Sequence, residues 1–427
     1  MKNKFIKSTI ILLIGGLLTK VLGMTIKIIM ARLIDTKTLG MYMLILPTFT
    51  LLISLSSFSF PLALSKLIGE NNRNNKRLVF SSLPVLIIIN IILIILIVLL
   101  SPIISNKLLH NKDVYISILS MSLVIPFTSI SSICRSYFFG KQQMFPHVLS
   151  NIIEDLVRLI IIVIGIQLIK PYGSKYIVCF LILINIISEI ISTLVLIIFL
   201  PKNIKIKKED LYPNKSYIKD SLKICIPSIT SKLIGSIGFF LEPIILTNIL
   251  LNKYSLNYIT TEYGIISGYV IPLILLPSFF TLALSQSLLP SISNDSIHNN
   301  TKSIKKKISY TILISLILGI PITLLLLIKG DFLLKTIYHT NKGFNYIRIL
   351  SPICLLQYIQ APLSYTLDAL GKSKTNLIST IIATITRTIS LIIFSKLGIY
   401  SLIISISLNI IVTTLYQIKK VRYYLTF

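Results

Sequence analysis

Basic side chains interrupt long apolar stretches of this sequence at two pairs of related positions. Lys20 lies in the segment TKVLG, and Lys232 lies in the similar segment SKLIG. Arg158 follows the segment SNII, and Arg387 follows STII. A guanidinium group binds oxyanions through two parallel hydrogen bonds, whereas an ammonium group acts as a mobile point charge. We therefore interpret these four cations as candidates for binding a phosphate or a pyrophosphate.

The depth of these cations in their expected helices supports a functional role. All four lie roughly 20 Å from the expected cytoplasmic ends, at about 1.5 Å per residue. A charge at mid-membrane costs about 2.5 to 3.5 kcal/mol by insertion scales, so a duplicated charge there indicates function. Gly16, Lys20, Gly23 and Lys27 share one helix stripe, and small residues beside cations leave room for a ligand. Alternatively, the glycines allow close helix packing and the lysines extend toward the membrane surface.

Nearby acids decide between a structural and a ligand-binding role for the arginines. Glu154 and Asp155 precede Arg158 by about one helical turn, so a helical ion pair is the alternative to a phosphate contact. The corresponding positions before Arg387 are alanine and threonine, so no carboxylate lies near it in the sequence. We expect Arg387 to be the better phosphate ligand.

Two further acids, Glu189 and Glu242, lie in apolar stretches, where they either bind a coupling ion or pair with a cation on another helix. No P-loop, Gly-rich dinucleotide turn or HExxH segment is present, and the four histidines stand apart near span ends. We expect a protein that is not an enzyme, binds no metal and needs no cofactor.

The composition is that of a protein embedded in a membrane. The mean hydropathy is +0.86, 54% of residues are hydrophobic and 13% are charged. The net charge of +28 does not indicate nucleic-acid binding, because most basic residues fall in short loops between apolar spans. The first apolar stretch is too long for a signal peptide and is expected to remain as a helix. The four cysteines are scattered and form no CxxC pair.

Apolar stretches of about 20 residues predict an all-α polytopic membrane protein with about twelve transmembrane helices. Repeated segments, including LALS at 62–65 and 282–285, indicate two six-helix lobes of the same orientation, related by pseudo-twofold symmetry. The expected domains are an N-terminal lobe at 1–200, a basic cytoplasmic linker at 201–218, a C-terminal lobe at 219–417 and a tail at 418–427. The expected spans are 6–32, 40–67, 79–105, 113–138, 145–169, 174–200, 219–250, 264–290, 308–329, 344–370, 374–396 and 398–417.

The loop charges predict the orientation in the membrane. If the N-terminus is cytoplasmic, about twice as many basic residues lie in inner as in outer loops, and the even number of spans returns the C-terminus to the same side. We expect a multi-pass protein of the bacterial cytoplasmic membrane with both termini in the cytoplasm.

Several motifs resemble those of a known family. The segments GLLTKVLG at 16–23, RSYFFGKQ at 135–142 and FFLEPI at 239–244 are similar to stage V sporulation protein B-like members of the MOP flippase superfamily. That superfamily includes lipid II flippases, oligosaccharide flippases and multidrug and toxin extruders of the MATE-like fold. The resemblance places Lys20 where lipid II flippases have a cationic cavity residue, whereas Lys27 stands where they commonly have an acid. Full-length relatives usually have fourteen helices.

The resemblance and the buried cations together predict a transporter. It would flip an undecaprenyl-pyrophosphate-linked cell-wall or polysaccharide precursor, such as one for spore cortex peptidoglycan, by alternating access. Its partners would be the lipid-linked glycan, membrane lipids, and a coupling ion or the membrane potential, with no nucleic acid, and we expect a monomer. Lys20, Lys232 and Arg387, with Arg158 and Lys27, would bind the pyrophosphate. One alternative is an ion-coupled extruder of small molecules, and another is a scaffold in envelope assembly.

Overall fold

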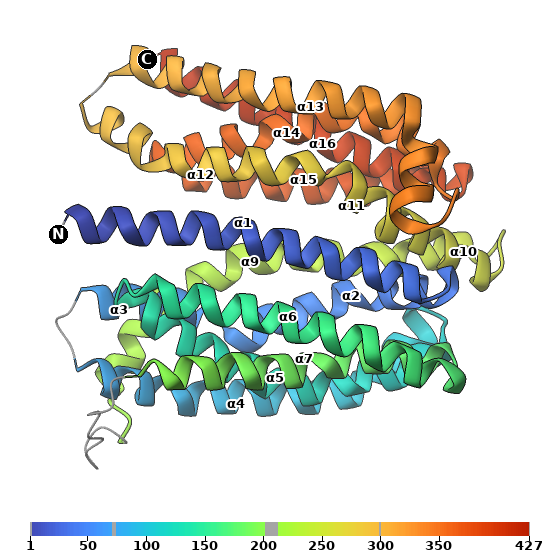
Figure 1. Cartoon of the computed structure of the whole chain (residues 1–427), viewed down its shortest axis with the longest axis horizontal. Coiled ribbons are helices and arrows are strands. Elements are labelled where there is room, and N and C mark those ends of the chain that lie inside the picture. The colour runs from blue at the N-terminus through green and yellow to red at the C-terminus, as the bar shows by residue number, and fades with distance from the viewer. Residues whose placement is uncertain (1, 71–73, 201–211, 299, 427) are drawn as a thin grey trace. The chain divides into compact units, whose positions relative to one another are not determined.

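The structure is a computed structural model that describes residues 2–70, 74–200, 212–298 and 300–426. Within these ranges the regular structure is helical throughout, with no strand (Figure 1). The long helices are α1 (Lys2–Leu33), α2 (Thr36–Ser57), α4 (Asn75–Pro102), α5 (Tyr115–Gly140), α6 (Met144–Ile169), α7 (Ser174–Ile198), α9 (Lys215–Leu250), α12 (Leu276–Ile297), α13 (Thr301–Tyr338), α14 (Phe344–Ala369), α15 (Ser373–Ile393) and α16 (Tyr400–Thr426). Shorter helices are α3 (Phe60–Gly69), α10 (Leu256–Gly264) and α11 (Ile271–Ile274).

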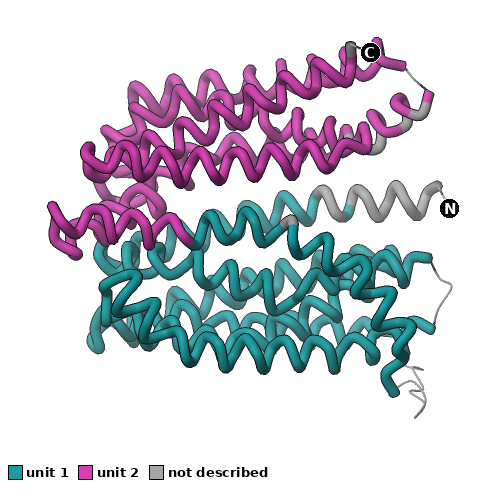
Figure 2. The backbone as a smooth tube through the Cα atoms, turned by 180° about the vertical axis from the view of Figure 1, so that it is seen from behind, with its two compact units in different colours: residues 1–240 teal, residues 241–427 magenta. Residues whose placement is uncertain are grey.

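The chain divides into two compact units, residues 1–240 and 241–427, so that the division falls within α9 (Figure 2). The first part of α9 belongs to the first unit because Cys225 is buried in one cluster with Phe60 and Leu78. The backbone N–H of Asn214 also donates a hydrogen bond to Ser81 Oγ at 3.0 Å. This division differs from the expected boundary at 201–218, of which residues 201–211 lie outside the described residues. The division into two six-helix lobes stays a prediction.

Both units consist of apolar helices that expose large hydrophobic side chains and bury small polar ones, the reverse of the pattern in water-soluble proteins. Several isoleucines of α4, such as Ile88 and Ile92, are more than half exposed, and so is Ile317 of α13. Small polar residues instead fill the interior, where Ser131 and Ser315 are fully buried. Exposed apolar residues with small residues at helix contacts are typical of helices packed in lipid.

Nine helical segments of the described chain are long and apolar enough to cross a membrane, and ten are if a bent pair counts as one. Helices α6 and α14 occupy two expected spans, 145–169 and 344–370, but lie outside this set. The centre of α6 carries three charged residues, and α14 contains glutamines and two internal prolines. The multi-pass character is thus observed, and the number twelve stays a prediction.

Two expected spans are interrupted in the structure. The span expected at 40–67 is broken between α2 and α3, where Phe58 and Ser59 adopt left-handed φ angles of 45° and 56°. The span expected at 264–290 contains a π-helix, Ile265–Val270, and bends by 50° before α12. In both places the next helix has proline at its second residue, which lacks an N–H donor and disfavours helix in the residue before it. The repeated LALS segment lies after the break in each unit.

Candidate functional site

A network of charged side chains connects α5, α6 and α7 in the first unit. Glu154 of α6 accepts from two guanidinium groups, because Arg135 Nη2 pairs with its Oε2 and Arg158 Nη2 lies 2.6 Å from its Oε1. Arg135 Nη2 also lies 2.8 Å from Glu189 Oε2 on α7. The side chains of both glutamates are only 10% exposed. Buried charges of this kind are stable only when they are paired and hydrogen-bonded.

Hydroxyl groups of α7 complete this network. Arg135 Nη2 donates to Ser192 Oγ at 2.9 Å, and Arg158 Nη2 donates to Ser188 Oγ at 3.2 Å. Asp155 is the most exposed carboxylate of the network, and its Oδ1 lies 3.3 Å from Arg158 Nη1. The helical ion pair that the sequence offered as the alternative role of Arg158 is therefore present. Three carboxylates face two guanidinium groups, so the network as a whole favours one more positive charge.

Arg135 is the residue of this network that the sequence analysis missed. Its position near the end of the expected span 113–138 indicated no role in a site. The structure corrects this, since its side chain is 21% exposed and points to the carboxylates of α6 and α7. A basic residue at the end of an apolar span has the same sequence pattern whether it faces water or a buried acid on another helix. The acids Glu154, Asp155 and Glu189 outnumber Arg158, and this excess of acids was the signal that a second cation was needed.

A separate ion pair lies in the second unit. Arg387 Nε of α15 pairs with Glu242 Oε2 of α9, by proximity and without the alignment of a hydrogen bond. Tyr263 Oη of α10 donates to Glu242 Oε1 at 3.3 Å. Glu242 is 4% exposed, so its charge depends on Arg387. The absence of a nearby carboxylate in the sequence therefore did not leave Arg387 unpaired, because its partner comes from another helix, one of the two roles that we had considered for Glu242.

The three candidate lysines have a different environment. Lys20 and Lys27 of α1 and Lys232 of α9 are exposed, and no ion pair or hydrogen bond of their side chains occurs with another described residue. A Cβ atom on Gly16 or Gly23 would meet no atom of its own unit within 4 Å. These two glycines therefore do not serve close packing within the unit, and they leave open space on the lysine stripe of α1.

The structure thus separates the candidate cations into two groups. The arginines lie in ion pairs within their own units, and the lysines are accessible to a ligand. The described residues contain no group of three or more histidine, cysteine, aspartate or glutamate side chains that could hold a metal ion.

Family comparisons identify the class of protein. The model of the polysaccharide biosynthesis protein family matches residues 5–296, and the MatE model matches residues 243–393. The chain is 28% identical to stage V sporulation protein B of Bacillus subtilis (strain 168), over 97% of this chain and 83% of that protein. It is 21% identical to the lipid II flippase MurJ of the same organism, over 91% of this chain and 76% of that protein.

Solved structures share the fold. An inward-facing multidrug resistance MATE family transporter of the MOP superfamily superposes with a TM-score of 0.75 at 16% identity, covering 96% of this chain and 94% of that chain. A lipid II flippase MurJ in an inward closed conformation gives a TM-score of 0.74 at 18% identity, covering 96% and 87%. The names of these relatives describe a flippase, a transporter and a sporulation protein rather than enzymes. The chain therefore belongs to the polysaccharide biosynthesis protein family and is a multi-pass membrane protein of the all-α MOP type.

Proposed function

We propose that this chain is a flippase that moves an undecaprenyl-pyrophosphate-linked glycan precursor from the inner to the outer leaflet of the bacterial cytoplasmic membrane. Its termini would be cytoplasmic, and alternating access would expose the substrate site to each side in turn. The similarity to a sporulation protein and to a lipid II flippase supports a cell-wall precursor, with spore cortex peptidoglycan as one destination.

The observation that carries this proposal is the set of exposed, unpaired lysines in apolar helices. Lys20, Lys27 and Lys232 hold positive charge with no acidic partner among the described residues, and a bound anion would offset the cost of these charges in apolar helices. A pyrophosphate is multiply charged and rich in oxygen acceptors, so several ammonium groups suit it. A cationic drug would be repelled by the same lysines.

The arginines would contribute in a second way. Arg387 can bind a phosphate only when Glu242 releases it, and a proton or metal cation on Glu242 would bring about that release. Ion binding at Glu242 would then favour substrate binding at Arg387, which couples the two events. Arg158 would remain in the network with Glu154 and Asp155 and would stabilise that network rather than contact the substrate.

Reconstituted vesicles provide the test. Purified protein would be placed in liposomes that contain a fluorescent undecaprenyl-pyrophosphate glycan, and its transfer between leaflets would be measured with an impermeant quencher. We expect Lys20→Gln with Lys232→Gln to slow flipping by tenfold or more, because a hydrogen bond to a charged group contributes about 1.5 to 3 kcal/mol. Lys170→Gln, an exposed lysine at the end of α6, is the matched control. Normal flipping by the double variant at equal protein level would overturn the proposed site.

An ion-coupled extruder of small molecules is the second candidate, favoured by the MatE match over 243–393. The same vesicles can distinguish the two functions. Uptake of a cationic dye that depends on Glu242, without transfer of the lipid-linked glycan, would establish the extruder.

A further inference from the structure

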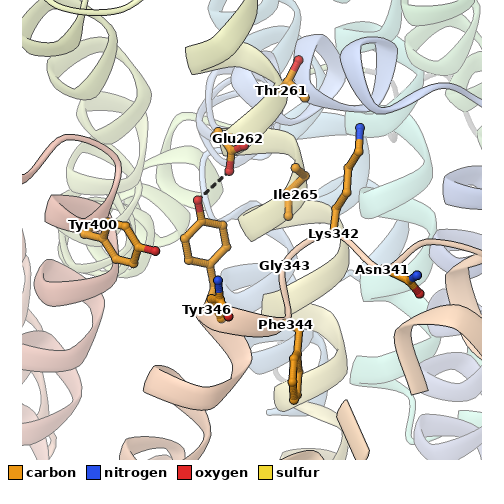
Figure 3. A pocket seen from close by; sticks show the side chains of 10 residues that line it. Thr261, Glu262, Ile265, Asn341, Lys342, Gly343, Phe344, Tyr346 and Tyr400 are labelled. Atoms are coloured by element: carbon orange, nitrogen blue, oxygen red, sulfur yellow. Dashed lines mark hydrogen bonds between the residues drawn. The ribbon is translucent and has the colours of Figure 1, made fainter. Parts of the chain in front are cut away.

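A polar cavity lies at one end of the second unit, apart from the ion pair of Glu242 (Figure 3). Its volume of about 460 Å³ is within the range of small-molecule sites, which is roughly 300 to 1,000 Å³. The lining comes from α10 and the first residue of the π-helix that follows it, from the connection between α13 and α14, and from the first residues of α14 and α16. The side chains that matter for its chemistry are Thr261, Glu262, Asn341, Lys342, Tyr346 and Tyr400.

The single carboxylate in the lining of this cavity, that of Glu262, has a fixed orientation beside aromatic rings. Tyr346 Oη donates a hydrogen bond of 2.6 Å to Glu262 Oε2, as Figure 3 shows. The Tyr346 and Tyr400 rings meet edge to face, with centroids 5.5 Å apart. Tyr400 is 40% exposed, so its ring is available to a ligand. Glu262 keeps its other oxygen for a second donor.

Tight packing holds the connection before α14 against this site. Gly343 has a φ angle of 99°, which favours glycine, and a Cβ atom there would lie 2.9 Å from Ile265 Cγ2. Asn341 and Lys342, just before this glycine, are exposed side chains that line the cavity. The cavity is therefore built from a well-packed turn that presents amide and ammonium donors.

This set of groups suits a carbohydrate. The C–H face of a sugar ring packs on an exposed aromatic ring, and its hydroxyl groups donate to a carboxylate and accept from amide and ammonium donors. A metal ion would lack ligands here, because Glu262 is the single acid in the lining. A phosphate would be repelled by Glu262.

The connections that meet at the cavity indicate which side of the membrane it faces. These are the connections that follow α9, α13 and α15. The first and the third are in close contact, because a Cβ atom on Gly398 would lie 2.8 Å from Tyr254 Oη. All three are outer loops if the N-terminus is cytoplasmic, as we propose. We propose that this cavity binds a sugar ring of the glycan headgroup on the outer side, after the headgroup has crossed the membrane. This inference rests on the proposed function for its source of glycan and on the proposed topology for its side.

A single tryptophan reporter tests carbohydrate binding directly. The natural chain has no tryptophan, so Tyr400→Trp gives a unique fluorophore at the cavity and retains an aromatic ring. Purified protein in detergent would be titrated with chitobiose, a disaccharide of N-acetylglucosamine, and with cellobiose, a disaccharide of glucose. We expect a saturable fluorescence change at about millimolar concentration for at least one of them. Glu262→Gln in the same background should weaken it by tenfold or more.

Matched controls separate this site from general effects. Tyr310→Trp places the reporter at an exposed tyrosine of α13 outside the cavity, where no saturable change is expected. Tyr346→Phe keeps the ring but removes the hydroxyl donor to Glu262, so binding should weaken without being lost. Sorbitol, an open-chain polyol without a sugar ring, and inorganic phosphate serve as control probes. Saturation-transfer NMR on the wild-type protein gives the same answer if Tyr400→Trp lowers the thermal stability.

The outcomes are independent of lipid transport. Saturable disaccharide binding that Glu262→Gln weakens supports the proposal, even if flipping of a lipid-linked glycan is not detected. No saturable signal by either method, or an equal response to phosphate or sorbitol, overturns it. Loss of flipping in the lysine variants concerns only the proposed function.

Discussion

At the scale of residues, Glu154 is where the buried charges of the first unit converge. Each of its carboxylate oxygens receives a different guanidinium group, from Arg135 and from Arg158. Among the described residues Glu189 forms one ion pair, with Arg135, and Arg135 retains Glu154 if Glu189 is removed. Replacing Glu154 would instead leave both arginines without their shared partner. The side chains of the two glutamates are equally buried, so a difference in stability between their variants reflects the number of ion-pair partners that each glutamate has.

We expect Glu154→Gln to lower the thermal stability of the purified protein more than Glu189→Gln does. Removing one partner from a fully buried ion pair costs about 3 to 5 kcal/mol, and the partial exposure of the arginines places this network below that range. Asp155→Asn is the control, because its single contact at 3.3 Å predicts about 1 kcal/mol or less. Melting curves in detergent measure all three. Equal melting temperatures for the two glutamate variants would contradict the convergence on Glu154.

A second prediction separates the structural role of Arg387 from its proposed role in binding. Arg387→Gln alone leaves Glu242 buried without its cation, so the amount of protein in the membrane should fall. Arg387→Gln combined with Glu242→Gln removes both charges and should restore that amount. If Arg387 also binds substrate, flipping per molecule stays low in the double variant. Full flipping activity at restored abundance would limit Arg387 to a structural role.

Except for Arg135, the positions of the buried charges followed from the sequence, but their partners on other helices did not. Arg158, Glu154 and Asp155 share one helix, so their spacing was sufficient to predict their ion pairs. Arg387 and Glu242 lie on helices that are far apart in the sequence. Apolar periodicity shows which face of a helix is apolar, but it does not show which two helices pack against each other. The open space beside Gly16 and Gly23, by contrast, was predictable from the stripe that these residues share with the lysines.

At the scale of elements, each unit contains one interrupted helix followed by the same LALS segment. The break before α3 has an unusual feature, because Ser59 is fully buried, has a left-handed φ angle of 56° and leaves its hydroxyl without a hydrogen-bond partner. A left-handed conformation costs a non-glycine residue about 1 to 2 kcal/mol. The sequence predicted the ends of α5 and α6 within two residues, whereas α13 and α16 extend beyond the expected spans 308–329 and 398–417. It did not predict the breaks, because membrane helices tolerate proline in continuous spans as well.

Glycine at position 59 should therefore stabilise the protein. We expect Ser59→Gly to raise the melting temperature, since it removes both the left-handed strain and the unsatisfied hydroxyl, with a net gain of about 1 kcal/mol. Ser57→Gly, in the last turn of α2, is the control and should lower stability by up to about 1 kcal/mol. A lower melting temperature for Ser59→Gly would show that the serine is needed at the break.

At the scale of the whole molecule, the length of α9 and the loop charges make orientation a testable property. Helix α9 has 36 residues and is about 54 Å long at 1.5 Å per residue, longer than the roughly 30 Å hydrocarbon core. Ser216 lies near its beginning and Asn257 lies just beyond its end, and both are exposed. The two positions should therefore lie on opposite sides of the membrane.

Cysteine labelling provides the measurement. The four natural cysteines would be replaced first, and single cysteines would then be introduced at Ser216 and Asn257. An impermeant maleimide added to intact cells should label position 257 and should label position 216 only after the cells are opened. Labelling of both from the outside would contradict the proposed orientation and the outward-facing cavity together.

The network around Glu154 also has a mechanical consequence. The ion pairs of Arg135 with Glu154 and with Glu189 connect α5, α6 and α7, so relative sliding of these helices would separate buried charges. These three helices should therefore move as one stiff body during transport, and bending should be confined to segments that no ion pair crosses, such as the break at Phe58 and Ser59. Spin labels on α5 and α7 would then report one constant distance through the cycle, while labels on α2 and α3 would report two.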